Sequence, residues 1–548
     1  MVDGKPKEQE GRLGRADRAA PSGVRFIALF VLTAAAGTLW AISSPLMSVP
    51  DEPAHTVKAV AVWRGEFKGR LIALPDRPDG TEAGHTYGVE IPKSYASANG
   101  LPSCYAFFPD IAANCAPDLD TSDELVDATT LAGAYPPLYY LLVGWPSRLL
   151  DADVGIYLMR VMSALVTAGL LTLGAWALAR VVRWPLVLLA VALAGTPEVF
   201  YLGGSINPNS LEIASGFALW CSALAVFLRW RRNGPIDRGP VVVLVVSAML
   251  MAHTRSLSPL FAAVILVGVA AFVGRRRLLE LVADRRAWML GGGLAVGMAT
   301  ALIWILSSGH LSAVTGGHHF DASDNVVLML GSMTDDWFAG MVAFFGWTDT
   351  GPVLPAVWIW LGSVSVVVSI ALLTGRRWRS LMLGLLVAVA AFAPVALQYP
   401  AAKDGMVIWQ GRYFLPIAVG VPVLAAVVLS ESTLFANVSR RLLLGVTSFL
   451  LIGQVSAHMA ATRRYVAGIR GRLNYFSQIR WSPPVSPLVL AVLTVVVFGG
   501  FVVLAALSGA EPTTVSDGPD DDLGTDAGDD VVVIPAVAPE PVEAGRPD

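Results

Sequence analysis

Residues 50–55 follow the first apolar segment of the chain and read Pro-Asp-Glu-Pro-Ala-His. The adjacent carboxylates of Asp51 and Glu52 can accept protons or bind a cation, and His55 lies one helical turn beyond Asp51. A plainer interpretation is open, because acidic residues favour helix N-termini and the pair would cap a helix that begins near Pro53. A cap needs only one carboxylate and leaves His55 unexplained. We therefore expect Asp51 and Glu52 to be catalytic or substrate-binding, with His55 beside them.

Three arginines lie at ends of apolar segments that we expect on the same side of a membrane as Asp51: Arg160, Arg255 and Arg412. Guanidinium groups bind phosphate bidentately, so we expect these three to bind the phosphate of a lipid-linked donor. The alternative is that they reach out to the lipid headgroups. Further polar site candidates on this side are Asn207, Asn209, His253, Gln410 and Tyr413.

Composition indicates which elements must position these residues. The chain has 548 residues, of which 55% are hydrophobic and 15% charged, and it repeatedly supplies apolar runs near the ~20 residues that a membrane-spanning helix needs. Runs such as 241–251 and 488–504 are apolar nearly all round, whereas β-barrel strands alternate. We predict an all-α polytopic membrane protein and not a barrel. The net charge of -3 gives no reason to expect a nucleic-acid partner.

Basic residues predict the orientation, because Lys and Arg in short loops stay preferentially on the cytoplasmic side. The tail before residue 23 is basic, and no small-residue cleavage site follows the apolar stretch after it. We expect residues 24–45 to be a retained anchor and the tail to be cytoplasmic. Asp51 and Glu52 then lie on the outer face.

The same rule yields about twelve spans. They are expected at 24–45, 155–181, 184–202, 209–229, 240–253, 258–274, 287–306, 353–374, 380–398, 412–430, 442–461 and 486–508. The arginine-rich stretch 463–480 would lie outside, against the rule. Either it binds anionic lipid or substrate phosphates, or the count is wrong by one span near the C-terminus.

Five regions follow from this arrangement. They are a cytoplasmic basic tail (1–23), the first transmembrane helix (24–45), an external loop domain with interfacial helices (46–152), a multi-span domain (153–510) and a disordered acidic tail (511–548). Cys104 and Cys115 lie in the external region, where their spacing suits a short disulfide loop, although free thiols are the alternative. Cys221 lies in an apolar run and is expected to be buried.

Cofactor motifs give little signal. The chain has no nucleotide-binding G-x-x-x-x-G-K-[ST] loop and no H-E-x-x-H metal helix. A divalent cation stays open, because His318, His319, Asp321 and Asp324 gather in one loop without a fixed ligand spacing. Asp349, in a Gly/Thr turn, is expected to be a turn cap.

Five motifs together resemble the bacterial membrane family called domain of unknown function 2142. They are PDEPAH (50–55), YPPLYY (135–140), SINPN (205–209), GWTDT (346–350) and QGRYFLP (410–416). The resemblance covers about residues 25–465, and the family is similar in layout to the glycosyltransferase-C superfamily. It implies that Asp51 is the base, that Glu52 supports it or contributes to a metal site, and that the sugar donor is linked to polyprenyl phosphate. Asn209 stands where such proteins often have Asp, which departs from the pattern.

These observations predict a glycosyltransferase-C-like enzyme in the bacterial cytoplasmic membrane. It would move a sugar from a polyprenyl-phosphate donor to an envelope glycan, lipid or protein on the outer face. Two alternatives stay open: a transporter or flippase of lipid-linked sugars, which would show inverted repeats and interrupted spans, and a non-catalytic scaffold of envelope assembly.

Overall fold

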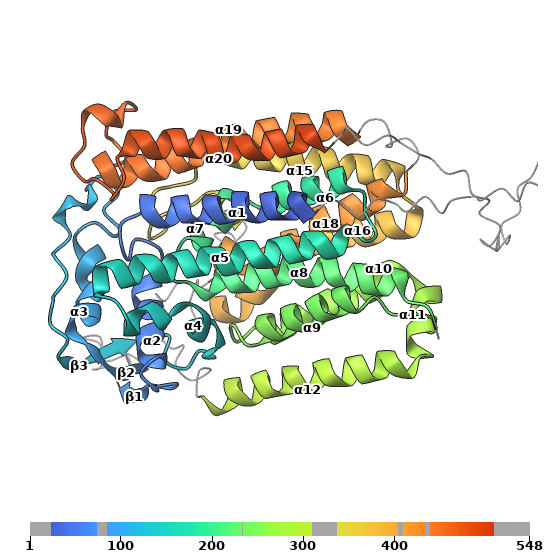
Figure 1. Ribbon diagram of the computed structural model, residues 1–548, viewed down its shortest axis with the longest axis horizontal. Helices are drawn as coiled ribbons and strands as arrows, with labels where there is room; N and C mark the ends of the chain where they lie inside the picture. The colour runs from blue at the N-terminus through green and yellow to red at the C-terminus, as the bar shows by residue number, and fades with distance from the viewer. Residues whose placement is uncertain are drawn as a thin grey trace, which may run out of the picture. The chain divides into compact units, whose positions relative to one another are not determined.

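The computed structural model describes residues 23–73, 85–232, 234–308, 337–403, 409–432 and 439–508, which fall within one compact unit. The expected basic tail, acidic tail and His318–Asp324 cation site lie largely or wholly outside these residues. The described part is a bundle of long apolar helices with a small mixed α/β region at one end (Figure 1). The protein is therefore a multi-pass membrane protein.

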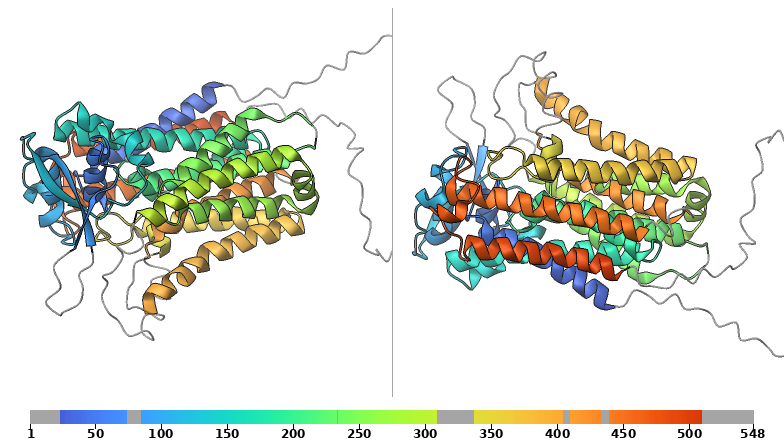
Figure 2. Two further views of the ribbon diagram at one scale, coloured as in Figure 1. Left: turned by 90° about the horizontal axis from the view of Figure 1, so that it is seen from below. Right: turned by 90° about the horizontal axis from the view of Figure 1, so that it is seen from above.

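The long helices of the bundle run roughly side by side, and they are joined by shorter helices such as α11 (Arg275–Val282), which is bent by 116° from the helix before it (Figures 1 and 2). The bundle helices are α1 (Gly23–Ser43), α5 (Ala152–Leu178), α6 (Trp184–Ala194), α7 (Pro197–Gly203), α8 (Pro208–Arg229), α9 (Arg238–Ala252), α10 (Ser258–Val273), α11, α12 (Arg285–Ser307), α15 (Leu354–Thr374), α16 (Arg377–Lys403), α17 (Leu415–Ala418), α18 (Gly420–Ser430), α19 (Ser439–Ala467) and α20 (Pro487–Leu507). Helix α8 is central, with 89% of its apolar window buried, whereas α12 and α16, at 17%, lie at the periphery. Peripheral apolar faces of this kind suit contact with lipid.

Each of the twelve apolar segments expected from the sequence is a helix or a helix pair. Nine described helices are long and apolar enough to span a membrane, and the number rises to eleven when two bent pairs are counted. The twelfth segment is α9, an apolar helix that is shorter than a typical span. The fold class is confirmed.

One expected helix, 184–202, is instead two helices, α6 and α7, bent by 73°. The break lies at Gly195, Thr196 and Pro197, and proline cannot continue the backbone hydrogen-bond ladder. The Thr196 side chain accepts a hydrogen bond from the backbone N–H of Val199 and so caps α7. The bend places an irregular backbone segment inside the bundle.

Residues between α1 and α5 form a structure that we call the cap, and the end of the bundle that carries it the cap end. The cap contains α2 (Glu52–Val62), β1 (Arg70–Ala73), β2 (His85–Pro92), α3 (Lys93–Ala96), η1 (Ser97–Cys104), η2 (Ala113–Cys115), β3 (Leu125–Thr130), α4 (Leu138–Val143) and η3 (Trp145–Arg148). The strands form an antiparallel sheet in the order β1-β2-β3, with Val89 opposite Ala128. The buried Lys58 ties α2 to this region by donating to the carbonyls of Phe67 and Gly133, each at 2.6 Å. The sheet was not expected from the sequence.

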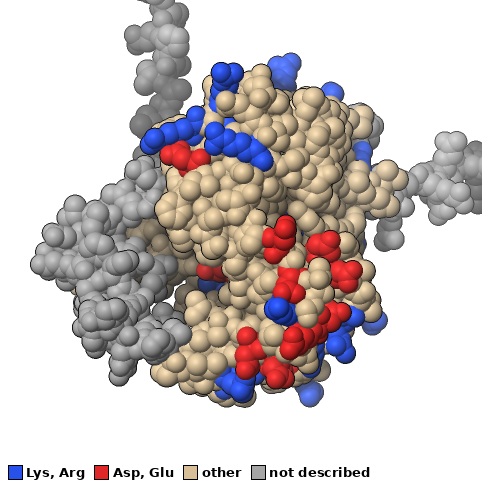
Figure 3. Space-filling model, turned by 90° about the vertical axis from the view of Figure 1, so that its left-hand side faces the viewer, with Lys and Arg blue, Asp and Glu red and all other residues tan. Residues whose placement is uncertain are grey.

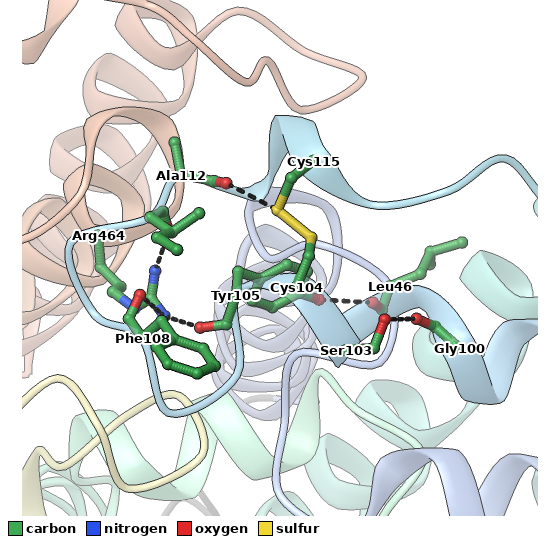
Figure 4. Close-up of a disulfide and its surroundings, with 10 residues drawn as sticks. Leu46, Gly100, Ser103, Cys104, Tyr105, Phe108, Ala112, Cys115 and Arg464 are labelled. Atoms are coloured by element: carbon green, nitrogen blue, oxygen red, sulfur yellow. Dashed lines mark hydrogen bonds between the residues drawn. A yellow bond between two sulfur atoms is a disulfide. The ribbon is translucent and has the colours of Figure 1, made fainter.

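A disulfide closes the cap loop between Cys104 and Cys115, the pairing that the sequence left open (Figure 4). Inside this loop, the Arg464 guanidinium donates to the carbonyls of Tyr105 and Ile111, each at 2.7 Å. Arg464 belongs to α19, so one buried guanidinium fastens the disulfide loop to the bundle.

Asp349 completes this contact and is more than the turn cap expected from the sequence. Its Oδ2 accepts from Arg464 at 2.8 Å and from the backbone N–H of Phe107 at 3.0 Å. Both side chains are nearly inaccessible to solvent, at 1% and 5% exposure. A buried ion pair of this kind is costly to break because the remaining charge is left without a partner.

Replacing Arg464 by Met should therefore lower the free energy of unfolding by about 3–5 kcal/mol. The thermal midpoint of the purified protein in detergent measures the loss. Arg470→Met is the matched control, because its ion pair with Asp110 is exposed and should contribute little. The double variant Arg464→Met, Asp349→Asn should recover part of the stability, and equal losses for Arg464→Met and Arg470→Met would contradict the assignment.

Candidate active site

Asp51 and Glu52 are adjacent, yet their side chains lie in different environments. Asp51 is the residue before α2 and has a left-handed backbone with φ of 65°, a conformation that costs a non-glycine residue about 1–3 kcal/mol. Its side chain is 51% exposed, whereas that of Glu52 is fully buried. Asp51 makes no side-chain capping hydrogen bond to α2. The simple capping interpretation therefore does not explain Asp51.

Glu52 is engaged by Arg160 of α5. Arg160 Nε donates to Glu52 Oε1 at 2.7 Å and Nη2 donates to Oε2 at 2.6 Å. The remaining N–H groups of Arg160 donate to the carbonyls of Ala41, Ser44 and Pro45 at 2.7–2.9 Å. A guanidinium has five N–H donors, so every donor of Arg160 has a protein partner.

This geometry changes the role of both residues. Arg160 has no donor left for the donor phosphate that the sequence assigned to it, and Glu52 is inaccessible to a substrate. Glu52 Oε1 also accepts from the backbone N–H of Ile206 at 3.1 Å. We therefore assign Glu52 and Arg160 to positioning, because together they fix the backbone from which Asp51 projects.

Arg412 contacts Asp51 directly. Arg412 lies in η6 (Gly411–Phe414), and its Nη2 donates to Asp51 Oδ2 at 2.8 Å. The residue is only 3% exposed, and its buried Nε has no hydrogen-bond partner in the part of the chain that the structure describes. Arg412 thus presents an unused donor beside an accessible carboxylate.

Arg255 provides a second guanidinium beside Arg412. It lies in the turn between α9 and α10, and the Tyr413 ring is close to both groups, 4.5 Å from the guanidinium carbon of Arg255 and 5.2 Å from that of Arg412. Arg255 donates to Asn209 Oδ1 and lies 3.7 Å from a carboxylate oxygen of Glu212. An aromatic ring next to two guanidiniums helps to hold the cations together.

His55 lies on α2 one turn beyond Asp51, among aromatic groups of the YPPLYY motif. Its Nδ1 is 2.9 Å from the Tyr140 hydroxyl, and its ring meets the Tyr135 ring edge to face. Burial lowers the pKa of His55 to about 3, although the Asp51 charge opposes this shift. His55 is therefore neutral near pH 7 and helps to orient Tyr135 and Tyr140.

The two asparagines of the SINPN motif both support the site. Asn207 caps α8 by accepting from the backbone N–H of Asn209, and its amide donates to the carbonyl of Pro50 at 3.0 Å. Asn209 accepts from Arg255. Because Asn207 holds the residue before Asp51 and Asn209 holds a phosphate-binding candidate, both act on the site through other residues.

His253 and Gln410, also predicted from the sequence, differ in placement. His253 contacts the Met249 carbonyl and Thr300 Oγ1 of α12, at 3.0 and 3.1 Å, and makes no hydrogen bond to Asp51 or the two arginines. We do not retain it as a site residue. Gln410 directly precedes Arg412's helix, and its buried Oε1 has no hydrogen-bond partner among the described residues.

Two buried carboxylates were missed in the sequence. Glu212 of α8 accepts from Ser258 at 2.5 Å and compensates the charge of Arg255. Glu198 lies in the first turn of α7, within electrostatic reach of Arg412, and among the described residues its side chain accepts only a long hydrogen bond of 3.4 Å from the Phe344 N–H. The signal was present, since acidic residues inside apolar segments are expensive and usually functional.

Metal ligands do not gather at this site. Among the described residues no group of three His, Cys, Asp or Glu side chains is placed to hold a metal ion.

Residues 35–421 match the family described as "Predicted membrane protein (DUF2142)". The chain belongs to this family. The match includes all five motifs, and so Asp51, Arg255 and Arg412 lie within the DUF2142 region. No curated protein matches the sequence.

Two crystal structures of ArnT from Cupriavidus metallidurans are similar to the DUF2142 chain. The structure bound to undecaprenyl phosphate has 13% sequence identity and a TM-score of 0.39, and the apo structure has 14% and 0.38. Each match covers 89% of this chain and 77% of ArnT. At such TM-scores the likeness carries no conclusion about activity.

Glu52→Gln and Asp51→Asn should differ in how strongly they reduce stability. Glu52→Gln leaves the buried Arg160 charge uncompensated and should destabilise the protein by about 3–5 kcal/mol. Asp51→Asn removes the partner of the buried Arg412, but the Asp51 side chain is half exposed, so the free energy of unfolding should fall by less, about 1–2 kcal/mol. Thermal midpoints of the two purified variants compare them directly. A larger loss for Asp51→Asn would reverse the assignment.

Acid should destabilise the protein partly through His55. Its pKa is about 3 in the folded protein and near the ordinary 6.5 when unfolded. The unfolded state therefore binds the extra proton first as the pH falls below about 6.5, and stability is lost between there and about pH 3. From pH 6 to pH 5 the wild type should lose about 1 kcal/mol more than His55→Gln. Thermal midpoints across this range test the expectation, and parallel profiles would contradict it.

Proposed function

We propose that this protein is a membrane glycosyltransferase that transfers a sugar from a polyprenyl-phosphate donor to an envelope acceptor on the outer face of the bacterial cytoplasmic membrane. One observation carries the proposal: the half-exposed Asp51 carboxylate is bonded to Arg412, and Arg255 adjoins Arg412 across the Tyr413 ring. A general base thus lies next to two cations at one end of a membrane bundle.

The two guanidiniums suit a lipid-linked phosphate. Such a phosphate must be held where the lipid chain can stay in the bilayer, and Arg255 and Arg412 lie at the ends of apolar helices. Arg412 has a spare Nε donor, and guanidiniums bind phosphate oxygens in pairs. Both cations are preorganised by Glu212, Asn209 and Tyr413, so little reorganisation is needed when the phosphate arrives.

The proposed reaction is a single displacement. Donor phosphate replaces Asp51 on Arg412, and Asp51 then accepts the proton of the acceptor hydroxyl. The hydroxyl oxygen forms a bond to the anomeric carbon while the bond between that carbon and the phosphate oxygen breaks. The departing polyprenyl phosphate takes the electron pair, and Arg412 and Arg255 stabilise its charge.

A flippase of lipid-linked sugars is the second candidate. The bent α6–α7 pair and the buried Glu198 in its second helix favour it, because transporters use interrupted helices and charges within the membrane. Transfer is preferred because the accessible carboxylate and both arginines lie at one end of the bundle. A flippase has no need for a base at that place.

Asp51→Asn should reduce sugar transfer by about 100-fold or more, because the acceptor proton loses its base. The assay incubates the purified full-length protein with radiolabelled polyprenyl-phosphate sugars extracted from its own envelope and measures label that leaves the lipid. Asp123→Asn, an exposed carboxylate elsewhere in the cap, is the matched control and should transfer at the wild-type rate. Unlabelled undecaprenyl phosphate, the lipid in the ArnT crystal, serves as a competitor.

Arg412→Gln and Arg255→Gln should each weaken the binding of undecaprenyl phosphate. The concentration of this competitor that halves transfer should therefore rise about tenfold in each variant. Transfer retained in Asp51→Asn would remove Asp51 as the base. Movement of intact labelled lipid across vesicle membranes without cleavage would support the flippase.

A further inference from the structure

The loop between α19 and α20, residues 468–486, has an unusual charge for its position. Helix α19 ends at Ala467 and α20 begins at Pro487, both at the cap end of the bundle (Figure 1). The loop therefore lies on the same side as Asp51, where basic residues are normally depleted. It nevertheless contains Arg470, Arg472 and Arg480 and no acidic residue. The structure thus gives no support to a miscounted span here, and the charge needs another explanation.

These arginines make few contacts within the part of the chain that the structure describes. Arg464, just before the loop, donates its hydrogen bonds to the disulfide loop and to Asp349. By contrast, Arg470 is 86% exposed and has only a 3.3 Å ion pair with Asp110. The side chains of Arg472 and Arg480 are exposed and make no hydrogen bond or ion pair within the described ranges. Surface guanidiniums of this kind are free to bind an external anion.

Apolar side chains surround the same arginines. Leu473, which follows Arg472, is 83% exposed, and Ile479, which precedes Arg480, is 49% exposed. The exposed apolar surface continues into α20 through Leu488 and Val489. Only 28% of the apolar window of α20 is buried, so this helix presents its surface to lipid. The loop is thus a continuation of a lipid-facing surface.

Charge is unevenly distributed over the cap end. Figure 3 shows one group of mainly Lys and Arg side chains in the upper part of this face, whereas the lower part carries most of the Asp and Glu side chains together with further Lys and Arg. A basic surface with exposed leucine and isoleucine that adjoins a lipid-facing helix matches the pattern of membrane-interface anchors. A soluble polyanion would not explain the apolar part.

We propose that residues 470–480 bind the headgroups of anionic phospholipids in the leaflet at the cap end. The arginines contact the headgroup phosphates, and Leu473 and Ile479 insert among the acyl chains. This surface is separate from the Asp51 site and does not depend on the proposed transfer reaction.

A site-specific quenching experiment tests this proposal. Ser477→Cys introduces an exposed thiol in the loop, and the native cysteines do not compete, because Cys104 and Cys115 are joined and Cys221 is buried. The full chain is labelled with a small fluorophore and reconstituted in phosphatidylcholine nanodiscs. Brominated phosphatidylglycerol or brominated phosphatidylcholine is then added at equal mole fractions, and quenching of the loop label is compared.

Local enrichment of the anionic lipid is expected at about fivefold per arginine. The variant Arg472→Gln, Arg480→Gln removes two of the three arginines and should lower the ratio of anionic to zwitterionic quenching to the smaller preference that Arg470 alone supplies, about fivefold. Lys68→Gln, Arg70→Gln removes the same charge around β1, on the other side of the cap, and should leave the ratio unchanged (Figure 1).

Three outcomes would overturn the proposal. They are no preference of the label in the wild type, an undiminished preference in Arg472→Gln, Arg480→Gln, and an equal loss of preference in both charge variants. The last result would assign the effect to net charge. Leu473→Ser provides an independent readout, because loss of an inserted side chain should reduce quenching by both lipids.

Discussion

The buried ion pair between Glu52 and Arg160 is the interaction on which the rest of the candidate site depends. Through one guanidinium it joins α5 to α2 and to the chain that leaves α1, and through Glu52 it reaches the backbone of Ile206 before α8. Burying two charges is expensive and contributes little net stability, so such pairs are better understood as devices that fix geometry. Here the fixed element is the turn at Asp51. The strained left-handed backbone there persists because the neighbouring residue is held on every side.

Charge balance explains how the two arginines beside Asp51 can be buried. Arg412 has Asp51, and Arg255 has Glu212 and Asn209. These partners differ in accessibility: Glu212 is fully enclosed, whereas the Asp51 side chain is half exposed. An incoming anion can therefore displace Asp51 from Arg412 but cannot displace Glu212 from Arg255. The same displacement frees the carboxylate, so anion binding and release of a base are one event.

The fold was largely predictable, because apolar runs of span length need only be counted and each proved to be helical. The site was predictable as a set of motifs but not as a set of roles. Asp51 and Glu52 are neighbours of the same chemistry, and only the position of Arg160 decides which one is buried. The bend before α7 had local signals in Gly195 and Pro197, yet the apolar run continues through it. The cap sheet pairs strands from separate parts of the sequence, so hydrophobic periodicity along one segment does not reveal its partners.

The unusual arginines near the C-terminus show why charge counting misjudges a loop of this kind. The positive-inside rule concerns basic side chains that face water or headgroups. Arg464 faces neither, because its side chain is buried and its Nη1 and Nη2 groups are bonded to Tyr105, Ile111 and Asp349. It acts as a structural residue, as Arg160 does, and should be left out when basic residues are counted to predict the orientation. Arg470, Arg472 and Arg480 remain exposed and do contribute. Their cost on that side is offset if anionic headgroups meet them there, so the apparent exception to the rule becomes evidence for a surface that contacts lipid.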